Sequence, residues 1–152
     1  MNGAGKQCGI RYSNDMNMER FRFLIVDDSE MIRQFILVQL RSLGAKVIEQ
    51  ACDGQEALRV IQQSMLAETP FHIVILDWEM PKMSGFDVLK KCREDPFLKN
   101  VAFLMVSTVC DESRIRKIAP YVPNGYLVKP FTPQAFAERV AALCEKIQHT
   151  IT

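Results

Sequence analysis

The sequence has no hydrophobic run long enough to cross a lipid bilayer. Its longest apolar stretches, such as residues 101–106, are far shorter than the roughly 20 residues that a membrane-spanning helix needs. A large charge of one sign is also missing, because the formal net charge is +1 and runs of like charge are short. We therefore expect neither membrane insertion nor nucleic acid as the main partner.

A signal peptide is missing as well. Residues 1–20 are polar and rich in Gly and Asn, without the apolar core that secretion requires. We interpret them as a flexible leader, followed by one domain over residues 21–149 and a short tail at 150–152. A chain of 152 residues is an ordinary length for one domain.

Cysteine and histidine show no metal or disulfide spacing. The five cysteines form no CxxC pair, which favours reduced thiols and a cytoplasmic location, with several cysteines packed as small hydrophobic residues. The two histidines, His72 and His149, are too far apart in sequence to suggest a metal site.

After residue 20, short apolar segments alternate five times with helical patterns. The expected strands are residues 23–26, 46–51, 72–76, 101–106 and 125–128. The residues expected to cap the helices that follow are Ser29, Asp53, Ser84, Asp111 and Thr132. Several strands are continuous apolar runs, which is typical of parallel strands covered by helices on both faces. The pattern predicts an open parallel α/β sheet.

Two segments interrupt this pattern. Residues 63–70 are expected to form a long loop after the second helix. The helix that begins after Asp111 should end near Pro120, because proline disfavours a continuing helix.

Polar residues follow four of the apolar strands. They are Asp27 and Asp28, then Asp77, Ser107 and Lys129. Ligands of open α/β sheets bind outside the carboxyl ends of the strands, so we expect these side chains to share one pocket. Three carboxylates there suit Mg²⁺, which would offset the repulsion between the two adjacent acids.

This set of groups also suits phosphoryl chemistry. A carboxylate beside Mg²⁺ can attack a phosphoryl group to form an aspartyl-phosphate, while Lys129 and Ser107 neutralise charge on the transferred oxygens. The simpler alternative is that Asp27 and Asp28 only favour the helix N-terminus electrostatically. That alternative explains one acid better than it explains two.

The segments FLIVDDSEMIR, VILDWEMPKMSGFDVL, FLMVST and NGYLVKPF together resemble response-regulator receiver domains of two-component signalling, in particular the stand-alone CheY-like type. The resemblance covers roughly residues 21–148. It implies a doubly wound, flavodoxin-like (βα)5 fold with strand order 2-1-3-4-5.

The resemblance also implies a role for each matching residue. Asp77 would accept the phosphoryl group, and Mg²⁺ would be held by Asp27, Asp28, Asp77 and the backbone carbonyl of Glu79. Ser107 and Lys129 would contact the phosphoryl oxygens. Tyr126 would swing inward on activation, and Pro130 would hold the turn after Lys129, often through a cis bond.

The implied function is that of a single-domain response regulator. It would accept phosphate from a histidine kinase or a histidine phosphotransfer protein, catalyse only its own phosphorylation and dephosphorylation, and signal by binding another protein, as in chemotaxis. The target would bind the face formed by the helix after Asp111, strand 125–128 and the last helix, where a weak phosphorylation-dependent dimer could also form.

Three alternatives stay open at this point. The protein could be a phosphorelay intermediate that passes phosphate to a histidine phosphotransfer protein. A Mg²⁺-dependent phosphohydrolase that uses Asp77 fits less well, because Glu79 stands where such enzymes carry a second Asp and no insertion is large enough for a cap. The complete set of site residues argues against a receiver that never takes phosphate.

Two positions depart from the chemotaxis pattern. Glu79 replaces an Asn, and Thr108 stands where the family often has Ala or Gly. Because a β-branched residue can narrow the route to Asp77, we expect slow phosphorylation by small donors and slow autodephosphorylation. Replacement of Thr108 by Ala should accelerate both.

Overall fold

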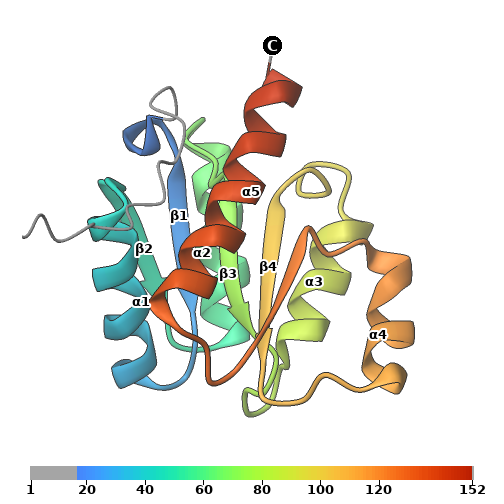
Figure 1. The fold of residues 1–152 in the computed structure, drawn as a ribbon. Helices are drawn as coiled ribbons and strands as arrows, with labels where there is room; N and C mark the ends of the chain where they lie inside the picture. Colours follow the sequence, from blue (N-terminus) through green and yellow to red (C-terminus); the bar gives the residue numbers. More distant parts are fainter. Residues whose placement is uncertain (1–16, 152) are drawn as a thin grey trace, which may run out of the picture.

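The computed structural model describes residues 17–151, which fold around a five-stranded parallel sheet (Figure 1). Its strands are β1 (Arg22–Val26), β2 (Val47–Ala51), β3 (Ile73–Asp77), β4 (Ala102–Ser107) and β5 (Gly125–Val128). They lie in the order β2-β1-β3-β4-β5, and Val26 of β1 is aligned with Ala51 on one side and Leu76 on the other. The predicted fold class and strand order are confirmed.

Helices cover both faces of the sheet. They are α1 (Glu30–Ser42), α2 (Gly54–Leu66), α3 (Gly85–Glu94), α4 (Glu112–Ile118) and α5 (Pro133–Ile151), with 3-10 turns at Met18–Arg20 and Ala119–Tyr121. In Figure 1, α1 and α5 lie on the near face, and α2 and α3 lie behind the sheet. No helix in the described part of the chain is long and apolar enough to span a membrane.

The sheet separates two hydrophobic cores. Alternate residues of each strand point to opposite faces, so Leu24 packs under α2 and α3, whereas Phe23 and Ile25 pack under α1 and α5. Every residue of β3 and β4 is buried. This two-sided burial explains why these strands are continuous apolar runs in the sequence.

The five predicted N-caps are all present. Side-chain oxygens of Ser29, Asp53, Ser84, Asp111 and Thr132 each accept a hydrogen bond from a backbone N–H in the first turn that follows. Ser84 and Asp87 form a reciprocal capping box. The caps begin α1, α3 and α5, the helices that follow three of the strand ends where the predicted site residues lie.

Some boundaries differ from those expected. The loop predicted at 63–70 begins later, because α2 continues to Leu66, with the Ser64 hydroxyl bonded to the Ile61 carbonyl. The turn Met18–Arg20 falls within the predicted leader, and Met18 packs against the core. The rest of that leader, residues 1–16, lies outside the described residues. The helix α4 ends at Ile118, before Pro120 as predicted.

Arg93 of α3 joins three segments at the end of the sheet opposite the predicted site. Its guanidinium donates hydrogen bonds to the backbone carbonyls of Tyr121, Val122, Lys99 and Val101 and to Oδ1 of Asn124. It also lies 5.1 Å from the ring centre of Phe103. One of these partners, Val122, has a φ of 47°, a left-handed conformation that is costly for a β-branched residue.

We expect Arg93→Ala to lower the free energy of unfolding by about 2 to 4 kcal/mol, because several carbonyls lose a charged donor and the strained turn loses its support. Urea denaturation would measure this loss. Arg139→Ala, on an exposed position of α5, is the control and should change stability by less than about 0.5 kcal/mol. A similar small effect for both variants would contradict the stabilising role that we assign to Arg93.

Candidate functional site

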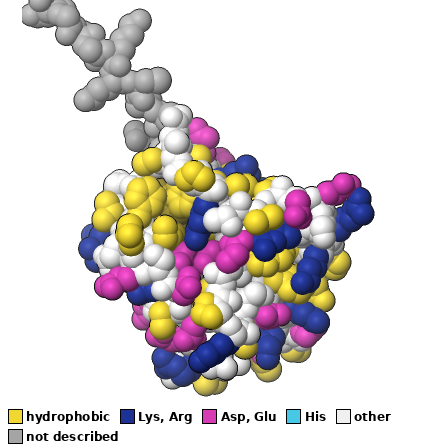
Figure 2. All heavy atoms as spheres, turned by 90° about the horizontal axis from the view of Figure 1, so that it is seen from below, with side chains coloured by type: hydrophobic (Ala, Val, Ile, Leu, Met, Phe, Trp, Pro, Cys, Tyr) yellow, Lys and Arg dark blue, Asp and Glu magenta, His cyan; other side chains and the backbone are white. Residues whose placement is uncertain are grey.

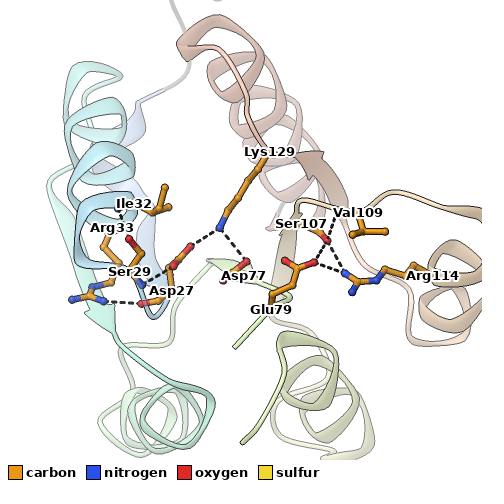
Figure 3. Close-up of polar contacts among 10 residues, drawn as sticks. All are labelled: Asp27, Ser29, Ile32, Arg33, Asp77, Glu79, Ser107, Val109, Arg114 and Lys129. Atoms are coloured by element: carbon orange, nitrogen blue, oxygen red, sulfur yellow. Dashed lines mark hydrogen bonds and ion pairs between the residues drawn. The ribbon is translucent and has the colours of Figure 1, made fainter. Parts of the chain in front are cut away.

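Three predicted site residues meet at the carboxyl edge of the sheet (Figure 3). Asp27 follows β1, Asp77 ends β3, and Lys129 follows β5. The Lys129 ammonium donates to Oδ2 of Asp27 at 2.9 Å and to Oδ1 of Asp77 at 3.1 Å. Asp27 and Asp77 are only 2% and 3% exposed. One ammonium thus joins two almost fully buried carboxylates from different strands.

Asp28 completes an acidic cluster. Carboxylate oxygens of Asp27, Asp28 and Asp77 lie within 4.8 Å of one another. Asp28 is exposed, whereas Asp27 is held in place by the Ser29 backbone N–H on its Oδ1 and by Arg33 on its carbonyl. The cluster therefore offers two buried oxygen ligands and one at the mouth of the site.

The electrostatics of the cluster favour a cation. Burial and the negative charge of Asp27 raise the pKa of Asp77 to about 7, although Lys129 opposes this shift. Burial disfavours the charged form of Lys129, but its bonds and attraction to Asp27 and Asp77 outweigh this and raise its pKa. One ammonium does not balance three carboxylates. The hard oxygen ligands and the surplus negative charge fit Mg²⁺.

The backbone around Asp77 is closely packed against α3. Gly85, the first residue of α3, donates its N–H to the Trp78 carbonyl at 2.9 Å. A Cβ at Gly85 would lie 2.0 Å from the Asp77 carbonyl oxygen, so only glycine fits there. The position of Asp77 is therefore set by strand and helix backbone and not by a loose loop.

Ser107 lies on the other side of the site, in a network with Glu79 and Arg114 (Figure 3). Its hydroxyl donates to Oε1 of Glu79 at 2.5 Å, and it accepts from Nη1 of Arg114 at 2.8 Å and from the Val109 N–H at 3.1 Å. Arg114 and Glu79 also form an ion pair. Burial opposes ionisation of Glu79, but the bonds from Ser107 and Arg114 outweigh it and hold its pKa below the usual value.

The other predicted residues lie around this centre. Tyr126 is half-buried, and its hydroxyl donates to the Val109 carbonyl at 2.8 Å. Thr108 is exposed beside the buried Ser107. Its predicted effect on access to Asp77 stays a prediction. The bond between Lys129 and Pro130 is cis, as expected.

The predicted residues therefore divide into two groups. The acids and Lys129 form one, while Ser107 and the Glu79 side chain form the other and bond to each other. Sequence reasoning missed Arg114, which looks like an ordinary solvated residue of an amphipathic helix. The unusual acid at position 79, which favours a nearby counter-charge when it is partly buried, was the only signal that pointed toward it.

The sequence also matches a known family. Residues 23–141 match the model of the response regulator receiver domain. The chain belongs to this family, and its fold and its relatives make it a CheY-like receiver domain. Receiver domains are signalling proteins of two-component systems.

Chemotaxis proteins are among its relatives. CheY-3 of Vibrio cholerae is 36% identical over 129 residues, which are 85% of this chain and 95% of that protein. CheY of Pseudomonas aeruginosa is 37% identical over 126 residues, 83% of this chain and 98% of that protein.

Solved structures show the same likeness. Vibrio cholerae CheY4 has a TM-score of 0.72 at 32% identity, covering 81% of this chain and 98% of its own. A CheX–CheY–BeF3–Mg complex from Borrelia burgdorferi has a TM-score of 0.73 at 30% identity, and the match covers 81% of this chain and 88% of that chain.

The raised pKa of Asp77 predicts a pH-dependent stability. Because its folded pKa of about 7 exceeds the ordinary 3.8, the folded protein binds this proton more tightly than the unfolded chain does. The resulting stabilisation is complete below about pH 4 and is lost as pH rises through about 7. Asp77→Asn, which stays neutral, should remove this loss.

With a chelator present, urea denaturation should show Asp77→Asn gaining on the order of 2 kcal/mol over wild type between about pH 5 and about pH 8. Glu145→Gln, at an exposed position of α5, should follow the wild-type profile. A constant difference between wild type and Asp77→Asn across this range would show that Asp77 does not titrate there.

Proposed function

We propose that this receiver domain accepts a phosphoryl group on Asp77 from a histidine kinase or a histidine phosphotransfer protein and signals through phosphorylation-dependent protein binding. The observation that carries this proposal is the Asp77 carboxylate itself, which lies beside Asp27, Asp28 and the ammonium of Lys129 at the carboxyl edge of the sheet. Membership of the receiver family supports the same chemistry.

The reaction uses groups that are already in place. An Oδ oxygen of Asp77 attacks the phosphorus of a phosphohistidine, a P–O bond forms, and the P–N bond breaks with its electron pair going to the imidazole nitrogen. Lys129, which lies 3.1 Å from Oδ1 of Asp77, is positioned to neutralise an oxygen of the transferred group. In the phosphorylated state, the Ser107 hydroxyl would donate a hydrogen bond to another phosphoryl oxygen.

The carboxylates of Asp27, Asp28 and Asp77, with the backbone carbonyl of Glu79, would hold Mg²⁺. The bound ion would supply positive charge to balance the phosphoryl oxygens. Asp27 and Asp28 would keep the ion beside Asp77, and the buried position of Asp27 would limit the access of water.

We assign output to the face formed by α4, β5 and α5. Tyr126 of β5 is tied to the Val109 carbonyl in the β4–α4 loop, so movement of Ser107 and this loop would release its ring. Target binding to this face, and any weak dimer of the phosphorylated form, would depend on that movement.

Phosphorylation can be tested directly on the intact protein. Acetyl phosphate with Mg²⁺ should add the mass of one phosphoryl group to wild type, while Asp77→Asn and wild type with EDTA should gain none. Asp95→Asn, in the α3–β4 loop, is a control that should be phosphorylated like wild type. An adduct that persists in Asp77→Asn would place the acceptor elsewhere.

An apolar surface beside the site favours a protein donor over a small molecule. Met31, Phe35 and Val38 of α1 are exposed at helical spacing, and the ring of Phe131, which follows the Lys129–Pro130 bond, packs 5.9 Å from that of Phe35. Figure 2 shows hydrophobic side chains gathered beside the acidic centre of this face. A helix that presents a phosphohistidine could bury these side chains while the histidine reaches Asp77. A phosphorelay intermediate would use the same surface to bind the histidine phosphotransfer protein to which it passes phosphate.

We expect Val38→Asp to slow phosphoryl transfer from a purified phosphorylated histidine phosphotransfer protein by about tenfold, because a charge would be buried in the complex. Its rate with acetyl phosphate should equal that of wild type. Leu66→Asp, at an exposed position that ends α2, is the control and should leave both rates unchanged. Equal slowing with both donors would mean that Val38 affects the site and not the docking of the donor.

A further inference from the structure

We propose that Glu79 and Arg114 hold the hydroxyl of Ser107 in the unphosphorylated protein, and that a phosphoryl group on Asp77 acts on α4 by displacing this contact. We call Ser107, Glu79 and Arg114 the hydroxyl clamp. The proposal rests on the proposed phosphorylation of Asp77 and adds two positioning residues to it.

The hydroxyl of Ser107 has a limited hydrogen-bonding capacity, and its partners in the structure already use all of it. A serine hydroxyl has one proton to donate and two lone pairs that accept. The proton goes to Oε1 of Glu79, and the lone pairs accept from Arg114 and from the Val109 N–H. Phosphoryl oxygens accept hydrogen bonds, so Ser107 can donate to one of them only if it breaks its hydrogen bond to Glu79.

Phosphorylation of Asp77 would also change the charge beside Glu79. A phosphoryl group brings about two negative charges to Asp77, only two residues from Glu79. Repulsion would then act on the Glu79 carboxylate just as Ser107 leaves it. Oε2 of Glu79 is buried with no hydrogen-bond partner, and Oε1 bonds to Ser107 and Arg114, so once Ser107 withdraws, Arg114 is the partner that remains among these. Glu79 would therefore move away from Asp77 together with its partner Arg114.

The helix α4, which carries Arg114, is weakly attached to the rest of the fold. Only Ile118 of its seven residues is buried, so the helix is held weakly by apolar packing. Arg114 supplies additional attachment through Glu79, through Ser107 and through the face of Trp78, whose ring centre is 4.7 Å from the guanidinium carbon. Displacement of the clamp would break the bond between Arg114 and Ser107 and shift the Glu79–Arg114 pair, which would free α4 to move.

A double-mutant cycle on Glu79→Gln and Ser107→Ala tests the clamp. The initial rate of phosphoryl adduct formation is measured by intact mass with acetyl phosphate and saturating Mg²⁺. Glutamine keeps the shape of Glu79 but accepts a weaker hydrogen bond, so Ser107 is released more easily. We expect Glu79→Gln to raise the rate by about tenfold when Ser107 is present.

In the Ser107→Ala background, the same Glu79→Gln change should alter the rate by less than about twofold. An equal acceleration in both backgrounds would overturn the clamp, because it would show that Glu79 acts only through its charge near Asp77. Glu112→Gln removes an exposed acid from α4 and is the matched control, which should change neither rate. Urea denaturation of each variant checks that the fold is kept.

The link to α4 has a separate readout. Trp78 is the only tryptophan in the chain, and it lies against Arg114, so its fluorescence reports on the position of that side chain. Phosphorylation should shift the Trp78 emission of wild type, and unphosphorylated Glu79→Gln should shift it in the same direction. Phosphorylation of Arg114→Gln should give a much smaller shift, whereas Arg116→Gln, on the same helix, should respond like wild type. A full response in Arg114→Gln would overturn the coupling.

The two levels of the proposal can fail separately. Wild type that gains no phosphoryl group from either acetyl phosphate or a phosphorylated histidine phosphotransfer protein would overturn the proposed function, and the clamp with it. Wild type that is phosphorylated while the rate cycle shows no coupling between Glu79 and Ser107 would overturn the clamp alone.

Discussion

The ammonium of Lys129, shared between Asp27 and Asp77, is the interaction on which the rest of the site depends. Two buried carboxylates at neighbouring strand ends repel each other and lose most of their hydration. Lys129 follows β5, which is an edge strand of the sheet. Its long side chain reaches past the end of β4 to both acids, which lie at the ends of β1 and β3. The same ammonium that stabilises these two carboxylates is therefore in position to meet a charged phosphoryl group in the proposed reaction.

The surroundings of the two sides of the site differ in rigidity. Asp77 ends a fully buried strand, and its carbonyl lies directly under Gly85 of α3, where no side chain fits. By contrast, α4 is short and buries one residue. A firmly held Asp77, the proposed acceptor, beside a weakly held helix is a suitable arrangement for a switch, because charge added at Asp77 would change the helix before it disturbed the sheet.

The network of Glu79, Ser107 and Arg114 links these two sides. An acid two residues after the acceptor would be unfavourable if it were buried alone, and Arg114 of α4 supplies its counter-charge. This arrangement ties the resting position of α4 to the hydroxyl that, in the proposed mechanism, would bond to the phosphoryl group. Membership of the receiver family supports the proposed acceptor and cation site, whereas the ion pair between Glu79 and Arg114 is read from the structure of this chain.

Local sequence signals determined much of this protein. Apolar runs placed the five strands, side-chain caps placed the helix starts, and the polar residues after four of the strands indicated the acidic site, because these features depend on neighbours in the chain. Predicted boundaries were less accurate at the end of α2, which continues to Leu66 through residues that we expected to form a loop. Only the tertiary structure showed that Lys129 bonds both Asp27 and Asp77, and that Arg114 faces Glu79 and Trp78. Those contacts join residues from different strands and helices, and their geometry is decided by how the sheet and α4 pack, which no local pattern records.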